Sequence, residues 1–460
     1  MTSAAAVDDF TGQLDAAVSA GPAWLEPVRR AAMARFESLG FPTTRNEDWH
    51  YTSAARIAEG GFQLMDSDEA NGGAPSGSRD ATTAGSRGVA TPALSVADLA
   101  PFQFGRADWH TLVFVNGRYT PALSNRSALP TGVRVQELGV ALKGDRAFVE
   151  ARLAKVAQFD EHAFTALNTA FVRDGAVIHI AKGTELEQPI HLLFVSDDGA
   201  DGVATHMRVL VAAESNSKAT VIESWVAIGA PRNFTNAVTE VDVADGATVT
   251  HLKIQRESAE ACHVGTVQVA QGRDSHFVSF SFATGAQLAR SNVYTHLNGA
   301  GCGSTLNGLY LAGGTQHLDA QTRIEHVEPN CYSREVYKGV LDGEGHGVFN
   351  GKVYVHPEAQ KTDGKQSNNN LLLSPSARVD TKPQLEIFAD DVKCTHGATV
   401  GRLDDLAMFY LNSRGIGPEP ARMLLTYAFA ADVLETIELE PLRKQLEKMV
   451  LARFADDSVT

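Results

Sequence analysis

Short runs of alternating apolar and polar residues fill the middle of the chain, from about residue 175 to residue 400. Alternation with a period of two is typical of β-strands, and no helical period separates these runs. The middle of the chain is therefore predicted to be β-structure. Its clearest predicted strands are 177–180, 190–195, 207–211, 220–226, 237–243, 248–254, 266–269 and 277–282.

A similar step of small residues leads into several β-type runs. It reads Gly-Ala-Thr-Val at 246–249 and again at 397–400, and related steps occur at 217–221, 285–288 and 376–379. A recurring corner is typical of a solenoid, in which each coil buries its apolar residues against its neighbours. Because the spacing of these corners is irregular, the pattern alone leaves a β-solenoid and a β-sandwich equally open.

Apolar residues at helical spacing flank the β-region on both sides. The helices predicted from this spacing are 7–19, 23–39, 144–156, 160–171, 403–412, 420–435 and 441–454. In 420–435 the apolar band is wider than one packed face needs, so a partner protein or neighbouring helices must cover its second side. A hairpin is also predicted at 111–123, because the turn pair Asn116-Gly117 joins two β-type runs.

The pattern divides the chain into five segments. Residues 66–94 are rich in Gly, Ser, Ala and Asp and predict a flexible linker. The full division is an N-terminal helical region (1–65), this linker (66–94), a hairpin and helices that lead into the core (95–171), the β-core (172–401) and a C-terminal helical domain (402–460).

Composition and charge narrow the function. The 460 residues carry a formal net charge of -15, which argues against a nucleic-acid or anionic-membrane partner. The first residues lack the basic start and apolar core of a secretory signal, and no stretch is apolar enough to span a membrane, so a cytoplasmic protein is expected. The four cysteines have no CxxC spacing and predict neither disulfides nor a zinc ribbon.

Residues 383–401 hold the most informative candidate site. Runs 385–388 and 392–396 predict two short strands joined by a corner at Asp390-Asp391. Cys394 and His396 are two apart and share a strand face, which places a thiol and an imidazole side by side, and both groups bind iron. A buried thiol and a hydrogen-bonded histidine are the ordinary alternative.

This run and others resemble the SufB/SufD family of the SUF iron-sulfur cluster assembly system, in its SufD form. The matching stretches are Arg45–Thr52, Phe349–Val353, Ala359–Asp363, Asn370–Ser374, Lys393–Gly397 and Phe409–Ile416. The resemblance covers residues 41–53 and roughly 326–437. It implies a mainly β fold, with a right-handed parallel β-helix core flanked by N-terminal and C-terminal α-helical domains, which decides between solenoid and sandwich.

The resemblance also implies a function. The chain would be a non-catalytic scaffold subunit that pairs with SufB through the C-terminal end of its β-helix and with the ATPase SufC through its C-terminal helices. No cofactor would be permanently bound, and a transient Fe-S cluster would be shared with SufB. His396 and then Cys394 are its implied ligands. The implied partner-binding residues are Phe409, Tyr410, Arg414, Leu424, Leu425, Tyr427 and Phe429.

Alternatives stay open. The chain could be a SufB-type paralogue that acts as the main cluster scaffold, a homodimer in isolation, or a β-helix enzyme that acts on polysaccharide. The sequence has no P-loop, HExxH, GxSxG or dinucleotide fingerprint, so ATP hydrolysis is expected to belong to a partner. His326, Cys331, His346 and His356 follow no ligand spacing, and Trp49 and Tyr51 are interpreted as local packing.

Overall fold

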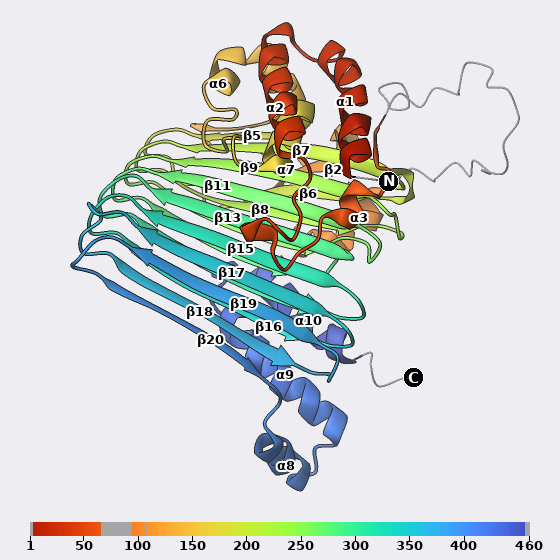
Figure 1. Cartoon of the computed structure of the whole chain (residues 1–460), viewed down its shortest axis with the longest axis vertical. Helices are drawn as coiled ribbons and strands as arrows, with labels where there is room; N and C mark the ends of the chain where they lie inside the picture. Colours follow the sequence, from red (N-terminus) through yellow and green to blue (C-terminus); the bar gives the residue numbers. More distant parts are fainter. Residues whose placement is uncertain (1–2, 66–93, 107, 456–460) are drawn as a thin grey trace, which may run out of the picture.

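The computed structural model describes residues 3–65, 94–106 and 108–455, and the predicted linker at 66–94 lies, except for its last residue, outside them. Within the described residues two ten-stranded sheets face each other (Figure 1). From β5 (Asp174–Ile180) onward, odd-numbered strands join one sheet and even-numbered strands the other. The chain therefore passes back and forth between the sheets and forms a parallel β-solenoid of about eight turns, which confirms the predicted core.

The first sheet, called sheet A, is parallel except where β4 pairs antiparallel with β5. Its strands are β4 (Val133–Glu137), β5 (Asp174–Ile180), β7 (Val203–Ala213), β9 (Phe234–Val243), β11 (Cys262–Gln271), β13 (Leu288–Leu297), β15 (His317–His326), β17 (His346–Val355) and β19 (Arg378–Ile387), with the short β1 (Gln63–Leu64) beside β7.

The second sheet, sheet B, is parallel except where β3 pairs antiparallel with β2. Its strands are β2 (His110–Val115), β3 (Arg118–Tyr119), β6 (Ile190–Ser196), β8 (Lys218–Ala227), β10 (Thr248–Arg256), β12 (His276–Ala283), β14 (Gly303–Ala312), β16 (Tyr332–Leu341), β18 (Asp363–Leu372) and β20 (Lys393–Gly401). The predicted hairpin is present, but its second strand is short because a 3₁₀ turn begins at Pro121.

Coil length varies along the solenoid, which explains why no fixed repeat is visible in the sequence. The register pairs Cys262 with Leu288 in one coil and His346 with Arg378 in a later one, and the second pair is further apart in the sequence. Side chains that point between the sheets form one long apolar core, which includes Phe349. The longer coils place their extra residues in the corners, so the paired strands stay in register.

Helices from the two ends of the chain cover the outer faces of the two sheets (Figure 1). On sheet A they are α1 (Ser3–Ser19), α2 (Glu26–Leu39) and α7 (Ala163–Phe171), with α5 (Leu138–Gly144) beside them. On sheet B they are α9 (Pro418–Leu434) and α10 (Glu440–Ala455), preceded by α8 (Asp405–Ser413). Two single-turn helices, α3 (Ala55–Ala58) and α4 (Val96–Leu99), complete the N-terminal part.

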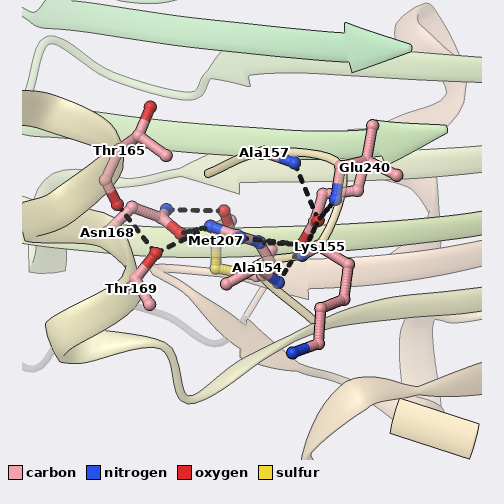
Figure 2. Close-up of polar contacts among 10 residues, drawn as sticks. Ala154, Lys155, Ala157, Thr165, Asn168, Thr169, Met207 and Glu240 are labelled. Atoms are coloured by element: carbon pink, nitrogen blue, oxygen red, sulfur yellow. Dashed lines mark hydrogen bonds and ion pairs between the residues drawn. The ribbon is translucent and has the colours of Figure 1, made fainter. Parts of the chain in front are cut away.

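The predicted helix at 144–156 is wrong in its second half. Only α6 (Arg146–Glu150) forms there, and residues 151–157 are turns. The cause is the buried carboxylate of Glu240, which accepts four backbone N–H bonds from residues 154 to 157 at 2.8–3.1 Å (Figure 2). Because these four N–H groups donate to one carboxylate, they do not form the backbone hydrogen bonds that would continue the helix.

Glu240 also belongs to a buried polar network that links α7 to the solenoid. Arg208 on β7 donates to the Glu240 carboxylate at 2.7 and 3.0 Å, and both side chains are almost fully buried. Arg208 also donates to Asn168 on α7. The Asn168 amide donates to the carbonyl of Met207 (Figure 2) and also to the carbonyl of Asn236. This network orients α7 across β7 and β9.

Candidate functional site: the open end of the solenoid

The strands that end the solenoid are its most exposed ones. β19 pairs on one side only with β17, and β20 pairs on one side only with β18, among the strands that the structure describes. Most residues of β20 are exposed, whereas β17 is mostly buried. Each of the two last strands therefore presents a row of backbone N–H and C=O groups without a neighbouring strand.

Cys394 and His396 lie on β20, where the strand period gives them the same face. Cys394 is half-buried and packs against a small apolar cluster at the end of the solenoid, which includes Val353 and Val355. His396 is exposed. The sequence prediction that the two side chains share one strand face at the edge of the β-structure agrees with this placement.

Burial raises the pKa of the Cys394 thiol, the Gly364 backbone N–H lowers it, and Asp363 raises it again. The thiol is therefore protonated at neutral pH in the isolated chain, and a metal would have to displace the proton. Gly364 is the register partner of Cys394, and a Cβ there would lie 3.4 Å from the Cys394 sulfur. Gly364 is itself buried, so this side of the sulfur faces the interior of the solenoid.

Behind His396, a row of polar side chains leads into the solenoid. His396 is in register with Gln366 on β18, and Gln366 with Glu335 on β16. The Gln366 amide donates to Glu335 at 2.7 Å, and burial raises the pKa of Glu335 to about 7. The sequence analysis did not find Glu335, because its register with Gln366 and His396 depends on coil lengths that no motif encodes.

Two other thiols, Cys302 and Cys331, do not join this site. Cys302 and Cys331 lie at a corner of the solenoid, where both sulfurs contact the carbonyl of Gly299. His326 and His346 are hydrogen-bonded to Ser333 and Asp380. Within residues 3–65, 94–106 and 108–455, no group of three or more His, Cys, Asp or Glu side chains is arranged to hold a metal ion.

The C-terminal helices place the predicted partner-binding residues in two different settings. Phe409, Tyr410 and Arg414 are exposed on or just after α8, with the Arg414 guanidinium 5.2 Å from the Tyr410 ring centre. Leu424 is also exposed. Leu425 is half-buried, as are Tyr427 and Phe429, which pack against the core beneath α9 and α10.

Leu406, which the sequence analysis missed, is 78% exposed and stands beside Phe409 (71%) and Tyr410 (57%). These three positions, i, i+3 and i+4 on α8, were a readable signal for one apolar helix face. In Figure 1, α8 projects beyond the last strands, at the same end as β20. An apolar face of this kind is typical of a protein interaction site.

The Arg45–Thr52 motif packs on sheet A. The Arg290 guanidinium lies 3.9 Å from the centre of the Trp49 ring and donates to the Asp48 carbonyl at 2.7 Å. Thr52 donates to Asp319 at 2.6 Å, and Asp319 pairs with Arg290 at 2.8 Å. The prediction of local packing for Trp49 agrees with these contacts, although its main partner comes from β13.

The fold defines a parallel β-solenoid protein with helical regions at both ends of the chain. The chain matches the SufBD core domain of SUF system FeS cluster assembly over residues 194–429, and the SufBD protein N-terminal region over residues 105–192. It belongs to the SufBD family of SUF-system iron-sulfur cluster assembly proteins.

Similar proteins carry names of the same family. The chain is 34% identical over 430 residues to the iron-sulfur cluster assembly protein SufD of Escherichia coli, which covers 93% of this chain and 92% of that protein. It is 33% identical over 433 residues to a SufBD family protein of Synechocystis, covering 92% and 90%. SufD of Bacillus subtilis is 28% identical over 441 residues, covering 93% and 94%. The described helices include none that is long and apolar enough to cross a bilayer.

Proposed function

We propose that this chain is the SufD-type subunit of a cytoplasmic SUF complex and acts as a scaffold without catalytic activity of its own. The observation that carries the proposal is the open end of the solenoid. There, as far as the described residues extend, both sheets end on strands that are paired on one side only, beside Cys394 and His396. The names of two relatives and the Lys393–Gly397 sequence support a SufD role over a SufB role.

In this proposal a SufB subunit adds its own strands to β19 and β20. Strand addition to an exposed edge gains backbone hydrogen bonds and buries the exposed residues of the last coil. His396 and Cys394 then lie at the subunit boundary. Two ligands are too few for a cluster, so SufB, sulfide or an exogenous thiol supplies the others, and the nascent cluster is cargo and not a resident cofactor.

The apolar face of α8 is proposed to receive the ATPase SufC. Leu406, Phe409 and Tyr410 supply a compact apolar patch, Arg414 lies beside Tyr410, and Leu424 is exposed on α9. Because α8 follows β20 after a few residues, movement of a protein bound to α8 acts close to the open end. ATP hydrolysis by the partner thereby opens or closes the boundary at which the cluster is assembled.

Blocking the open edge tests the proposed pairing. Lys393 donates its N–H to Thr362 at 2.8 Å, so the odd-numbered residues of β20 bond toward β18, and the even-numbered ones direct their N–H outward. Ala398→Pro removes one outward N–H and is expected to abolish co-purification of SufB, with the chain still folded. Ala398→Val keeps that N–H and is the matched control. Retention of SufB by the proline variant would refute the pairing.

The same complex tests the ligand role. After anaerobic reconstitution, His396→Ala is expected to lower the iron and sulfide content of the complex severalfold, without loss of SufB or SufC from the purified assembly. His179→Ala, which removes a histidine paired with Glu214 in the first coils, far from β19 and β20, is the control. Equal iron and sulfide in wild type and His396→Ala would remove this residue from cluster assembly and leave the pairing proposal standing.

A further inference from the structure

An arginine-lined cavity lies at the opposite end of the molecule from β20. It has two adjoining parts of about 330 and 600 Å³, which share Arg29, Arg118, Arg173 and Asp174 in their linings. Arg29 comes from α2, Arg118 from β3, and Arg173 from the residues between α7 and β5. Three segments far apart in the sequence therefore bring guanidinium groups to one place.

Cations outnumber carboxylates in this cavity. Burial, and then repulsion from Arg173, lowers the pKa of Arg29 to about 10, and the same two causes lower the pKa of Arg118. Lys143 adds a fourth cation to the lining. Among the described residues, the carboxylates in the lining are Asp174 and Glu137.

Both carboxylates are already engaged. Asp174 accepts backbone N–H bonds from Tyr119, Gly139 and Gly175 at 2.9, 3.4 and 2.8 Å. The negative charge of Asp174 raises the pKa of Arg118, but by less than burial and Arg173 lower it. Glu137 pairs with Arg126 at 2.7 Å. Among the described residues of the lining, cations therefore outnumber carboxylates in a protein whose formal charge is -15, and such a concentration of positive charge attracts anions.

The narrower part of the cavity has a less polar wall. Ala16, Ala17 and Leu64 line it, together with Phe171, on which the buried His206 ring stacks at 5.2 Å between centres. Burial lowers the pKa of His206 to about 3, so the imidazole is neutral, and its Nε2 atom has no hydrogen-bond partner among the described residues. A ligand in this part would meet an aromatic wall and one neutral polar atom.

Arg29 serves the fold, whereas Arg173 stands at the surface of the cavity. Arg29 is buried and donates to the carbonyl of Ala17 at 2.5 Å and to the carbonyl of Val172, which joins α1 to the end of α7. Arg173, by contrast, is exposed. Arg118 lies at the boundary of both parts of the cavity.

We propose that this cavity binds a small molecule that carries a phosphate group. The phosphate lies between Arg118 and Arg173, and the less polar part of the molecule lies under α1 beside Phe171 and His206. Guanidinium groups pair with phosphate oxygens through two parallel N–H bonds, which favours a multivalent oxyanion. The size of the cavity is in the range typical of small-molecule sites.

The test is calorimetric titration of the full chain with inorganic phosphate and with pyrophosphate, at constant ionic strength. Saturable binding of one equivalent is expected for pyrophosphate, and weaker saturable binding for phosphate. Arg173→Gln and Arg118→Gln are each expected to weaken pyrophosphate binding about tenfold, the effect of losing one charge-assisted contact. Arg273→Gln is the matched control, because Arg273 is a solvent-exposed arginine at a distant corner of the solenoid.

Circular dichroism establishes that each variant is folded, and the exposed position of Arg173 makes its variant the decisive one. A second readout is thermal unfolding, in which pyrophosphate is expected to stabilise the wild type and Arg273→Gln but not Arg173→Gln. Absence of saturable binding by the wild type, or equal affinity of Arg173→Gln and Arg273→Gln, would overturn the proposal. This result is independent of whether SufB pairs with β20.

Discussion

The two ends of this solenoid meet solvent in opposite ways. At the first coils, antiparallel strands β3 and β4 pair with the sheet edges, and α1, α2, α5 and α7 pack over sheet A. At the last coil, β19 and β20 have no further strand among the described residues, and α8 leaves an apolar face exposed. Among the described residues, the first coils are therefore covered by other parts of the chain, whereas the last coil is not.

The difference shows that coil stacking by itself does not complete a solenoid. Each coil satisfies its backbone groups through both neighbours, so the terminal coils need strands, helices or charged residues to cover them. The first end has intramolecular cover from the part of the chain that precedes β5, fixed by the Arg208–Glu240 network. In the proposed function, another subunit covers the end that is left open beside Cys394 and His396.

The largest effect is expected from a substitution that weakens the packing of the N-terminal region on the first coils. Glu240→Ala leaves Arg208 buried without its carboxylate and deprives four backbone N–H groups of their acceptor. The free energy of unfolding is expected to fall by about 3–5 kcal/mol, as for other broken buried ion pairs. Urea unfolding followed by circular dichroism measures it. Glu185→Gln, which removes a surface pair with Lys218, should leave stability unchanged.

A smaller effect, the pH dependence of the unfolding free energy, tests how completely water is excluded from the interior near the open end. Glu335 is separated from that end only by β18 and β20, yet burial raises its pKa from 4.5 to about 7. Below pH 4.5 the group is protonated in both states. Between pH 4.5 and 7 the unfolded chain loses the proton first, so the native state loses stability as pH rises, by roughly 3 kcal/mol in all.

Glu335→Gln is expected to remove this loss. The measurement is the difference in unfolding free energy between wild type and variant at pH values from 4.5 to 7.5, and that difference should grow with pH up to about 7. If the unfolding free energies of wild type and variant change in parallel over this pH range, water reaches Glu335 through the open end. The solvent exposure of the last coil would then extend as far as β16.

The smallest expected effect on stability comes from the exposed face of α8. Phe409→Ala removes a ring that is 71% exposed, so the unfolding free energy should change by less than about 0.5 kcal/mol. Capture of SufC by the tagged chain should nevertheless be lost. Val140→Ala at the covered end, where Val140 is also exposed, is the control and should change neither quantity. Full SufC capture by Phe409→Ala would argue against this face as the docking site.

The strands were predictable because alternation with a period of two depends only on neighbouring residues. Every strand predicted between 177 and 282 lies within an observed strand, and Cys394 and His396 share a face for the same reason. The architecture needed more than the pattern, since coils of unequal length conceal the repeat. Resemblance to a known family supplied what periodicity left open.

The features that the sequence did not reveal depend on contacts between distant segments. Residues 154–157 have helical composition, but the carboxylate of Glu240, far along the chain, takes their N–H groups. Likewise, Arg29, Arg118 and Arg173 form one cavity only after α2, β3 and the start of β5 are brought together. Leu406 could have been identified from the sequence, because its spacing from Phe409 and Tyr410 on the predicted helix 403–412 already indicated one apolar face.

The exposed edges of β19 and β20 have a consequence for how the subunits are supplied. Any occupant must bring two strands of its own, and a twofold axis through that end would set the strands of two solenoids antiparallel. A second copy of this same chain meets that requirement as well as a paralogue does. The relative dosage of the two genes would then decide how much of the chain is sequestered in symmetric pairs and how much enters the working assembly.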